Sequence, residues 1–412
     1  MSEPTAVRPL EPAALRQVVA VLCLTQIVAW GVLFYAFPVL APTISAEQGW
    51  SLPGLVAIFT AAQVVAGVAG VWVGRRLDRR GPRTIMTVGS CLGVLGIVAV
   101  ALAPGLPAYA LAWVAVGIAM AATLYPPAFA ALTHWAPVGV RVRALTAVTL
   151  VAGLASTVFA PLAAVLVDQV GWRRTYLVLA LVLALCIPAH LWGLRHRWVA
   201  ADGSGATDQA SPAPRPPRLR TLTAEPGFLL LVAAFTLAGF AVYAVVINQV
   251  PLLLEGGLST REAALALGIG GVGQVAGRLA YGRLLAPVPL RARTVGVLGA
   301  AALTTVAVGV ATGSFALAAV ASFAAGGVRG VFTLLQATAV SDRWGSQDYG
   351  ARNGVLTGGV TLAAAVAPWV GAAVAAALGG YRTAFLLLAL VAAGSALLVR
   401  PGDRRGLLAP TR

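Results

Sequence analysis

Apolar residues fall into twelve runs, each long enough to cross a bilayer as a helix. A helix rises about 1.5 Å per residue, so roughly 20 apolar residues span the hydrocarbon core. Only helices and closed barrels satisfy the backbone inside lipid, and runs of this length favour helices. The pattern predicts an all-α integral membrane protein. Its expected transmembrane spans are 17–42, 52–74, 84–103, 107–132, 144–168, 173–194, 227–254, 262–285, 293–311, 314–340, 351–378 and 381–400.

The composition agrees with this pattern. Hydrophobic residues make up 59% of the chain and charged residues only 10%, whereas soluble domains carry about 25% charged residues. A net charge of +16 is typical of nucleic-acid-binding proteins when the basic residues cluster on a soluble domain. No such domain is visible in the hydropathy pattern, so we expect no nucleic-acid partner.

The basic residues predict the orientation in the membrane. All 29 are arginine. If the N-terminus is inside, 23 of them lie in the tails and in the loops on the inner side. This asymmetry predicts cytoplasmic termini. The lysine-free, alanine-rich usage suggests a bacterial cytoplasmic (inner) membrane. Four arginines fall on the opposite side and two inside helices: Arg173, Arg174, Arg261 and Arg382, then Arg278 and Arg329.

The sequence carries no sign of cofactor or catalytic chemistry. The three cysteines, Cys23, Cys91 and Cys186, lie on separate apolar runs without CxxC spacing, which favours buried thiols over a metal site. The phosphate-binding GxxxxGK[ST] motif is missing from the sequence. We therefore expect neither an enzyme nor a cofactor or metal, and a monomer whose partners are the lipid bilayer and a small-molecule substrate.

A polar stretch divides the chain into two halves. Residues 195–226 are rich in Gly, Ser and Pro, as in flexible linkers. The expected domains are therefore a six-helix bundle over 1–194, a cytoplasmic linker over 195–226 and a second six-helix bundle over 227–412.

The two halves repeat each other at a nearly constant offset. "GWRRTYLVLAL" at Gly171–Leu181 matches "GYRTAFLLLAL" at Gly380–Leu390, 209 residues later. "GWS" at Gly49–Ser51 matches "GLS" at Gly257–Ser259, 208 residues later. Parallel six-helix repeats are typical of secondary transporters, whose substrate sites lie near the bilayer midplane.

The loop expected after the second span reads "GRRLDRRGPRT". It resembles the signature loop of the major facilitator superfamily. The resemblance implies that its aspartate forms a latch near the start of helix 11, where the helix dipole favours a carboxylate. Ala286 replaces this aspartate in the second half, so one half alone carries the complete latch. The matching gating residues are Gly74, Asp78, Arg79, Gly81 and Arg83.

Three further stretches are similar to the monocarboxylate transporters and oxalate/formate exchangers. These are "YAFP" at Tyr35–Pro38, the helix Arg143–Leu162 followed by "GWR", and "GRLAYG" around Arg278. The resemblance implies that Arg278 binds a substrate carboxylate. Val39 and Gln274 replace the lysine and acid that couple proton movement in the animal monocarboxylate carriers. We therefore expect anion exchange or a uniport-like mode.

Polar residues inside the apolar runs form the candidate substrate site. A charge at mid-membrane costs roughly 2.5–3.5 kcal/mol on insertion scales, and a guanidinium binds carboxylates through two hydrogen bonds. An anionic substrate therefore suits the two intramembrane arginines. The alternatives are that Arg278 extends to the membrane surface and that Arg329 binds carbonyls of a broken helix near Gly326. The substrate-binding candidates are Arg278, Arg329, Gln274, Tyr35, Trp30, Tyr125, Asn248 and Gln336.

These observations predict a secondary active transporter that moves a small, carboxylate-like organic anion across the membrane by alternating access. The alternative is an exporter of amphipathic drugs or metabolites, which would use the aromatic side chains of Trp30, Phe34, Tyr35 and Tyr125 more than the arginines.

Overall fold

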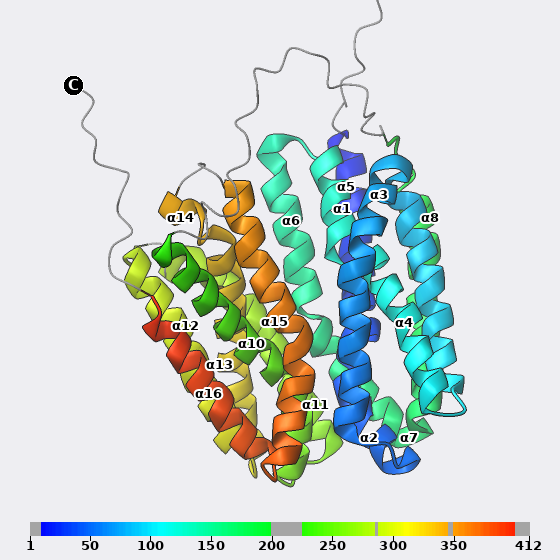
Figure 1. The fold of residues 1–412 in the computed structure, drawn as a ribbon. Coiled ribbons are helices and arrows are strands. Elements are labelled where there is room, and N and C mark those ends of the chain that lie inside the picture. The colour runs from blue at the N-terminus through cyan, green and yellow to red at the C-terminus, as the bar shows by residue number, and fades with distance from the viewer. Residues whose placement is uncertain (1–9, 199–224, 285–286, 345–348, 400–412) are drawn as a thin grey trace, which may run out of the picture. The chain divides into compact units, whose positions relative to one another are not determined.

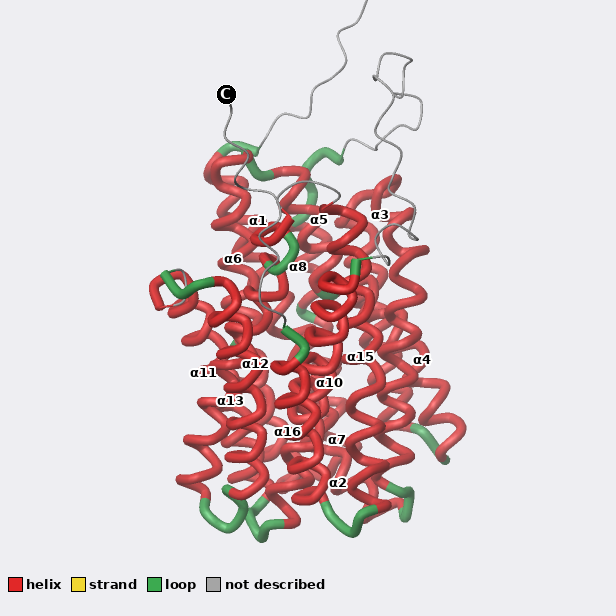
Figure 2. Tube along the Cα trace, turned by 60° about the vertical axis from the view of Figure 1, so that its left-hand side comes forward, coloured by secondary structure: helices red, strands yellow, loops and turns green. Residues whose placement is uncertain are grey.

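The computed structural model describes residues 10–198, 225–284, 287–344 and 349–399. Helices are the only regular elements in these ranges, and short loops connect them (Figures 1 and 2). The chain divides into two compact units, Met1–Asp208 and Gln209–Arg412, hereafter unit 1 and unit 2. The all-α fold expected from the hydropathy pattern is confirmed.

The described part of unit 1 contains nine helical segments, among them one π-helical turn, η1. Their bounds are α1 (Pro12–Trp30), η1 (Gly31–Tyr35), α2 (Ala36–Gln48), α3 (Leu52–Leu102), α4 (Leu106–Thr123), α5 (Tyr125–Trp135), α6 (Val138–Gly153), α7 (Ala155–Ala184) and α8 (Cys186–Gly193).

Unit 2 contains seven helices in its described residues. Their bounds are α10 (Pro226–Glu255), α11 (Thr260–Leu284), α12 (Leu290–Val310), α13 (Phe315–Thr338), α14 (Ser341–Trp344), α15 (Tyr349–Ala377) and α16 (Tyr381–Leu397).

The described helices account for the twelve expected spans. Within the described residues, nine helical runs are long and apolar enough to cross a membrane, and Tyr381–Leu397 is a shorter apolar helix. Two of the nine, Leu52–Leu102 and Gly139–Gly193, are 51 and 55 residues long, about twice the length that a bilayer requires. Each therefore contains two of the expected spans.

Each of these two long runs is interrupted at a glycine. Gly81 (φ 76°) and Gly171 (φ 77°) have left-handed backbone conformations that interrupt α3 and α7, and glycine adopts this conformation without a Cβ clash. The stretch after the second span was expected to be a loop from Gly74 to Thr84. This expectation was wrong, because the chain stays helical on both sides of Gly81 and Pro82 begins the next helical segment.

The internal repeat recurs in the backbone. Gly49 and Gly257 both have positive φ, at 67° and 90°. Ser51 caps α3 by accepting a hydrogen bond from the Gly54 amide, and Ser259 caps α11 in a reciprocal pair with Glu262. The helix pairs also correspond, since α3 packs on α4 as α11 packs on α13. The repeated sequence motifs therefore start equivalent helices.

Many large apolar side chains point outward in both units. Val68, Leu181, Leu303 and Leu397 are 72%, 71%, 73% and 85% exposed. Extensive exposure of large apolar side chains is unusual on soluble monomers, but it is what lipid requires. The fold therefore suits a bilayer.

The helices of unit 1 are irregular near the middle of their spans. η1 inserts a π turn after Trp30, and the chain bends at Leu124 between α4 and α5. Pro127 has no N–H for the carbonyl of Thr123, and the Gln26 side chain donates to this carbonyl instead, at 2.6 Å. Such interruptions are frequent at functional sites.

Candidate functional site

A seam of glycines brings α11 and α13 into backbone contact in unit 2. Six glycines line it, and a Cβ on most of them would overlap the facing backbone. At Gly277, for example, a Cβ would lie 2.9 Å from the Cα of Gly327. Small residues permit this close approach between membrane helices. The six are Gly270, Gly273 and Gly277 on α11 and Gly326, Gly327 and Gly330 on α13.

The seam joins two of the residues predicted to bind substrate. Nε of Arg329 donates to Oε1 of Gln274 across the helix pair, at 3.0 Å. Both side chains are only 8% exposed. The amide oxygen orients the guanidinium at Nε and itself carries no charge.

The expected alternative for Arg329 does not hold. α13 is continuous from Phe315 to Thr338, so no helix break near Gly326 and Gly327 supplies carbonyls to this guanidinium. The two glycines serve the close approach to α11 instead.

Arg278 lies next to the same seam. It is one turn beyond Gln274 on α11, and its backbone nitrogen would be 3.2 Å from a Cβ at Gly330. Its side chain is half-buried. Tyr281, further along this helix, is within 3.3 Å of the Thr338 hydroxyl of α13. The two arginines therefore occupy neighbouring positions on facing helices.

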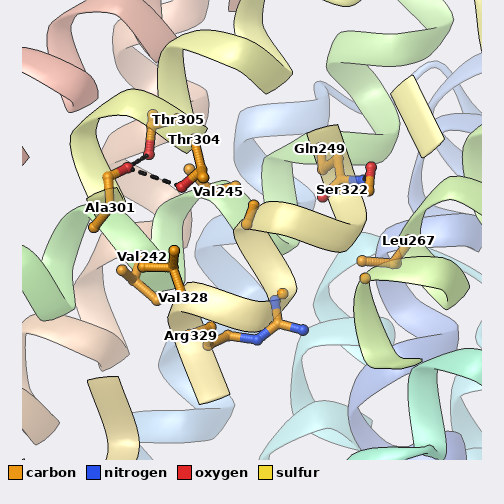
Figure 3. A pocket seen from close by; sticks show the side chains of 13 residues that line it. Val242, Val245, Gln249, Leu267, Ala301, Thr304, Thr305, Ser322, Val328 and Arg329 are labelled. Atoms are coloured by element: carbon orange, nitrogen blue, oxygen red, sulfur yellow. Dashed lines mark hydrogen bonds between the residues drawn. The ribbon is translucent and has the colours of Figure 1, made fainter. Parts of the chain in front are cut away.

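A small pocket opens beside Arg329 (Figure 3). Residues of α10, α11, α12 and α13 line it, and its room is about 10 Å³. This is close to the volume that one water molecule needs. Apolar side chains such as Val242, Val245 and Leu267 form much of the wall. The polar side chains that line it are Gln249, Thr304, Thr305, Ser322 and Arg329.

Gln249 and the two threonines were missed as site residues in the sequence. Gln249 directly follows Asn248, and this Asn-Gln pair interrupts an otherwise apolar helix, which was the available signal. Thr304 and Thr305 give no such signal, because threonines often occur in membrane helices with their hydroxyls bonded to the backbone.

Asn248 lies away from this pocket. It is 1% exposed, and its amide donates to the carbonyls of Ala244 and Pro368 at 2.9 and 3.1 Å. The bond to Pro368 ties α10 to α15. Gln336 is half-buried near the end of α13, two turns beyond Arg329. Neither residue lines the pocket, and their substrate contacts stay a prediction.

The aromatic candidates of unit 1 form a group of their own. The Trp30 ring is 5.0 Å from that of Tyr125 and 5.4 Å from that of Phe34, and Phe34 is 5.1 Å from Tyr35. The π turn η1 contains Phe34 and Tyr35, so this irregular turn sets how they face Trp30. The aromatic residues that sequence analysis named for an amphipathic substrate therefore do lie together.

The predicted gating residues surround the bend at Gly81. The Trp198 ring packs over Gly81, where a Cβ would lie 2.7 Å from its Cγ, and its indole N–H donates to the Asp78 carbonyl at 2.9 Å. Arg83 donates to the Leu191 carbonyl at 2.8 Å. These contacts fix the bend within unit 1. Gly74 and Arg79 lie in the helical part of α3 before it, and the latch role of all five stays a prediction.

Two six-helix repeats, one of which holds a buried guanidinium, are typical of secondary transporters. The sequence matches the family model described as Major Facilitator Superfamily over residues 22–318. The chain belongs to this superfamily, and it is a membrane transporter.

Solved structures agree on the fold. A bacterial homologue of the human lysosomal transporter Spinster, in an inward-facing and unoccupied conformation, is 17% identical with a TM-score of 0.67. A structure of the same kind of homologue in an occupied conformation is 16% identical with a TM-score of 0.65. Each match covers 95% of this chain and 95% of the solved chain. No curated protein sequence matches the chain.

Proposed function

We propose that this protein is a secondary transporter of small organic anions that works by alternating access and binds the substrate carboxylate at Arg329. The observation that carries the proposal is a guanidinium that is 8% exposed, borders a pocket and is held at Nε by a neutral amide. An ionisable side chain inside a membrane bundle is expensive and usually functional.

The chemistry of this pair supports an anion. A guanidinium matches the two oxygens of a carboxylate with two parallel hydrogen bonds. Gln274 fixes the plane of the guanidinium from one side, at Nε. The amide itself carries no charge, so it leaves the recognition of an anion to the guanidinium. Arg278, on the neighbouring turn of α11, adds a second positive charge to the same region.

The glycine seam supports a site of fixed geometry. Backbone contact between α11 and α13 leaves little freedom for Gln274 to shift against Arg329. A preorganised donor loses less entropy when it binds its ligand. The seam therefore favours recognition of one functional group over a promiscuous surface.

A ligand screen on the purified protein tests this proposal. Thermal unfolding is followed with hexanoate and benzoate and with their neutral amides, because a ligand raises the stability of the state that it binds. We expect the acids to stabilise the wild type more than the amides do, and Arg329→Gln to remove the difference. Arg382 is exposed, so Arg382→Gln is the control and should retain the difference between acids and amides. Equal shifts with acids and amides would contradict the proposal.

The second candidate function is export of amphipathic drugs or metabolites. The aromatic group of Trp30, Phe34, Tyr35 and Tyr125 favours it, since clustered rings bind apolar and cationic ligands. Stabilisation by lipophilic cations that survives in Arg329→Gln and disappears in Trp30→Ala would select this function instead.

The finer parts of the account are also proposals. The "YAFP" and "GRLAYG" stretches support a place near the monocarboxylate transporter and oxalate/formate exchanger branch. Val39 and Gln274 support exchange or uniport without proton coupling. The distribution of arginines supports cytoplasmic termini, and the lysine-free, alanine-rich residue usage supports a bacterial inner membrane. The polar stretch 195–226, most of which lies outside the described residues, supports the expected linker and domain limits.

A further inference from the structure

The three hydroxyl groups that line the small pocket in unit 2 already donate their hydrogens to backbone carbonyls. The hydroxyl of Thr305 donates to the Ala301 carbonyl at 2.7 Å and that of Thr304 to the Ala300 carbonyl at 2.8 Å. Ser322 donates to the Ala318 carbonyl. Because a hydroxyl has one hydrogen and two lone pairs, these three oxygens can offer only lone pairs to the pocket.

Gln249 completes this lining. Its Nε2 donates to Oγ of Ser322 at 2.7 Å. Because the Ser322 hydroxyl already donates its hydrogen to a carbonyl, it can only accept a hydrogen bond from Gln249. The NH₂ group of Gln249, and not its oxygen, must therefore face Ser322, which assigns the orientation of the amide. The carbonyl oxygen of Gln249 is thereby turned to the other side of the amide. Gln249, Thr305 and Ser322 are 3%, 3% and 1% exposed.

A group that hydrogen-bonds to the hydroxyl oxygens of this pocket must donate the hydrogen, and it must be small. The room of about 10 Å³ fits one oxygen atom with its hydrogens. None of the residues that line it, all in described helices, is acidic, so a buried ammonium would have no counter-charge there. A neutral hydroxyl meets both conditions.

We propose that the pocket formed by Gln249, Thr304, Thr305 and Ser322 is a subsite for a hydroxyl group of the transported acid. The inference rests on the proposed function, in which Arg329 binds the carboxylate. Arg329 borders the same pocket, so an acid bound at Arg329 would lie beside it, with only its hydroxyl entering the pocket.

The spacing on α13 indicates where the hydroxyl stands in the substrate. Ser322 and Arg329 are seven residues apart, which is two turns or about 10 Å along the helix axis. The Arg329 side chain leans back toward the start of its helix and shortens this span. A separation of several ångströms still remains, so the substrate is an acid whose hydroxyl lies at the far end of its carbon chain, not beside the carboxylate.

Matched acids test the subsite. Dissociation constants are measured by calorimetry on the full-length purified protein for hexanoate, 2-hydroxyhexanoate and 6-hydroxyhexanoate. We expect 6-hydroxyhexanoate to bind roughly three- to tenfold more tightly than hexanoate, the range for one neutral hydrogen bond, and 2-hydroxyhexanoate to show a smaller gain or none.

Two variants of the lining should remove this gain. Thr305→Val deletes one acceptor and keeps the side-chain volume and the Gln249–Ser322 bond, and Ser322→Ala deletes a second acceptor. Thr175→Val is the matched control, because Thr175 is also buried and donates to a carbonyl four residues back but lies in unit 1. The ratio of the hexanoate to 6-hydroxyhexanoate constants should fall toward one in both lining variants and stay unchanged in the control.

The outcomes separate this inference from the proposed function. If 6-hydroxyhexanoate binds no more tightly than hexanoate, or does not bind at all, the pocket holds solvent alone and the inference is wrong. A larger gain for the 2-hydroxy acid, or an equal gain in the lining variants, overturns it as well. Hexanamide and 6-hydroxyhexanamide complete the set. If the amides bind as tightly as the acids and the hydroxyl gain persists, the anion proposal fails while the subsite stands.

Discussion

Arg278 and Gln274 share one face of α11, because four residues make about one helical turn. We expect Arg278→Lys and Arg278→Gln to weaken anion binding, since an ammonium cannot reproduce the two parallel bonds of a guanidinium. The expected loss is about 1.5–3 kcal/mol, the range for a charged hydrogen bond, or one to two decades in affinity. Competition binding with hexanoate measures it. Unchanged affinity in both variants would identify Arg278 as a side chain that extends to the membrane surface.

The sequence predicted the individual side chains of this site better than their contacts. Gln274 and Arg329 were both named as binding residues, but on separate helices. Hydropathy along one helix does not report which face meets its neighbour. The contact depends on the glycines of α11 and α13, which permit backbone approach. The pocket was not predicted, because its polar residues come from α10, α12 and α13 and no spacing within one helix reveals them.

The glycine seam should be the part of unit 2 that is least tolerant of substitution. A Cβ at Gly326 would overlap the Gly270 carbonyl, and one at Gly277 the Gly327 carbonyl. Overpacking typically costs about 1–3 kcal/mol, and here the obstacle is backbone, which cannot rotate away. We expect Gly326→Ala and Gly277→Ala to lower the unfolding temperature in detergent.

Gly296→Ala provides the matched control. Gly296 lies in α12, and a Cβ there would have no neighbour within 4 Å. The substitution also raises helix propensity. If Gly326→Ala is as stable as Gly296→Ala, then α11 and α13 are not in backbone contact.

An ion pair joins the start of α10 to the start of α15. Both Nη atoms of Arg352 donate to the carboxylate of Glu225, each at 2.8 Å, and the guanidinium lies 5.0 Å from the Trp344 ring. The hydrogen bond from Arg352 holds the pKa of Glu225 below its usual value. The stabilisation is therefore present above the pKa of the unfolded chain and is lost as pH falls through the lower folded value.

We expect Glu225→Gln to reduce the unfolding free energy at pH 7 by about 1 kcal/mol or less, because the carboxylate is partly exposed. The difference from the wild type should shrink as the pH is lowered, since acid protonates Glu225 in the wild type and leaves the glutamine unchanged. Unfolding curves at pH 7, 5 and 4 measure it. A difference that stays constant over this range would show that the ion pair contributes no stability.

The twelve spans and their repeat were accessible from the sequence, since length, hydropathy and the matching "GWS" and "GLS" starts are local signals. The bends were less accessible. Glycine and proline predicted an interruption after the second span, but not that the helix continues up to Gly81 and resumes at Pro82. Trp198, which packs over this bend, lies more than a hundred residues away, and no local pattern connects the two.

The distribution of the arginines predicts the orientation of the chain in the membrane. Because 23 of the 29 lie in the tails and in the loops on one side, that side should be the cytoplasm. Reporter fusions after Arg83, within 204–214 and at Arg412 should all report a cytoplasmic location. A single periplasmic result among the three would contradict the twelve-span topology with both termini inside.

The central claim is that Arg329 recognises the carboxylate of a transported anion, and counterflow in proteoliposomes tests it most directly. Vesicles loaded with unlabelled hexanoate should accumulate labelled hexanoate through the wild type. Arg329→Lys should lower this rate at least tenfold at subsaturating substrate, because the ammonium loses the paired geometry, while the exposed-arginine control Arg382→Lys should retain it. Equal counterflow through wild type and Arg329→Lys, or transport of neutral and cationic compounds alone, would contradict the account.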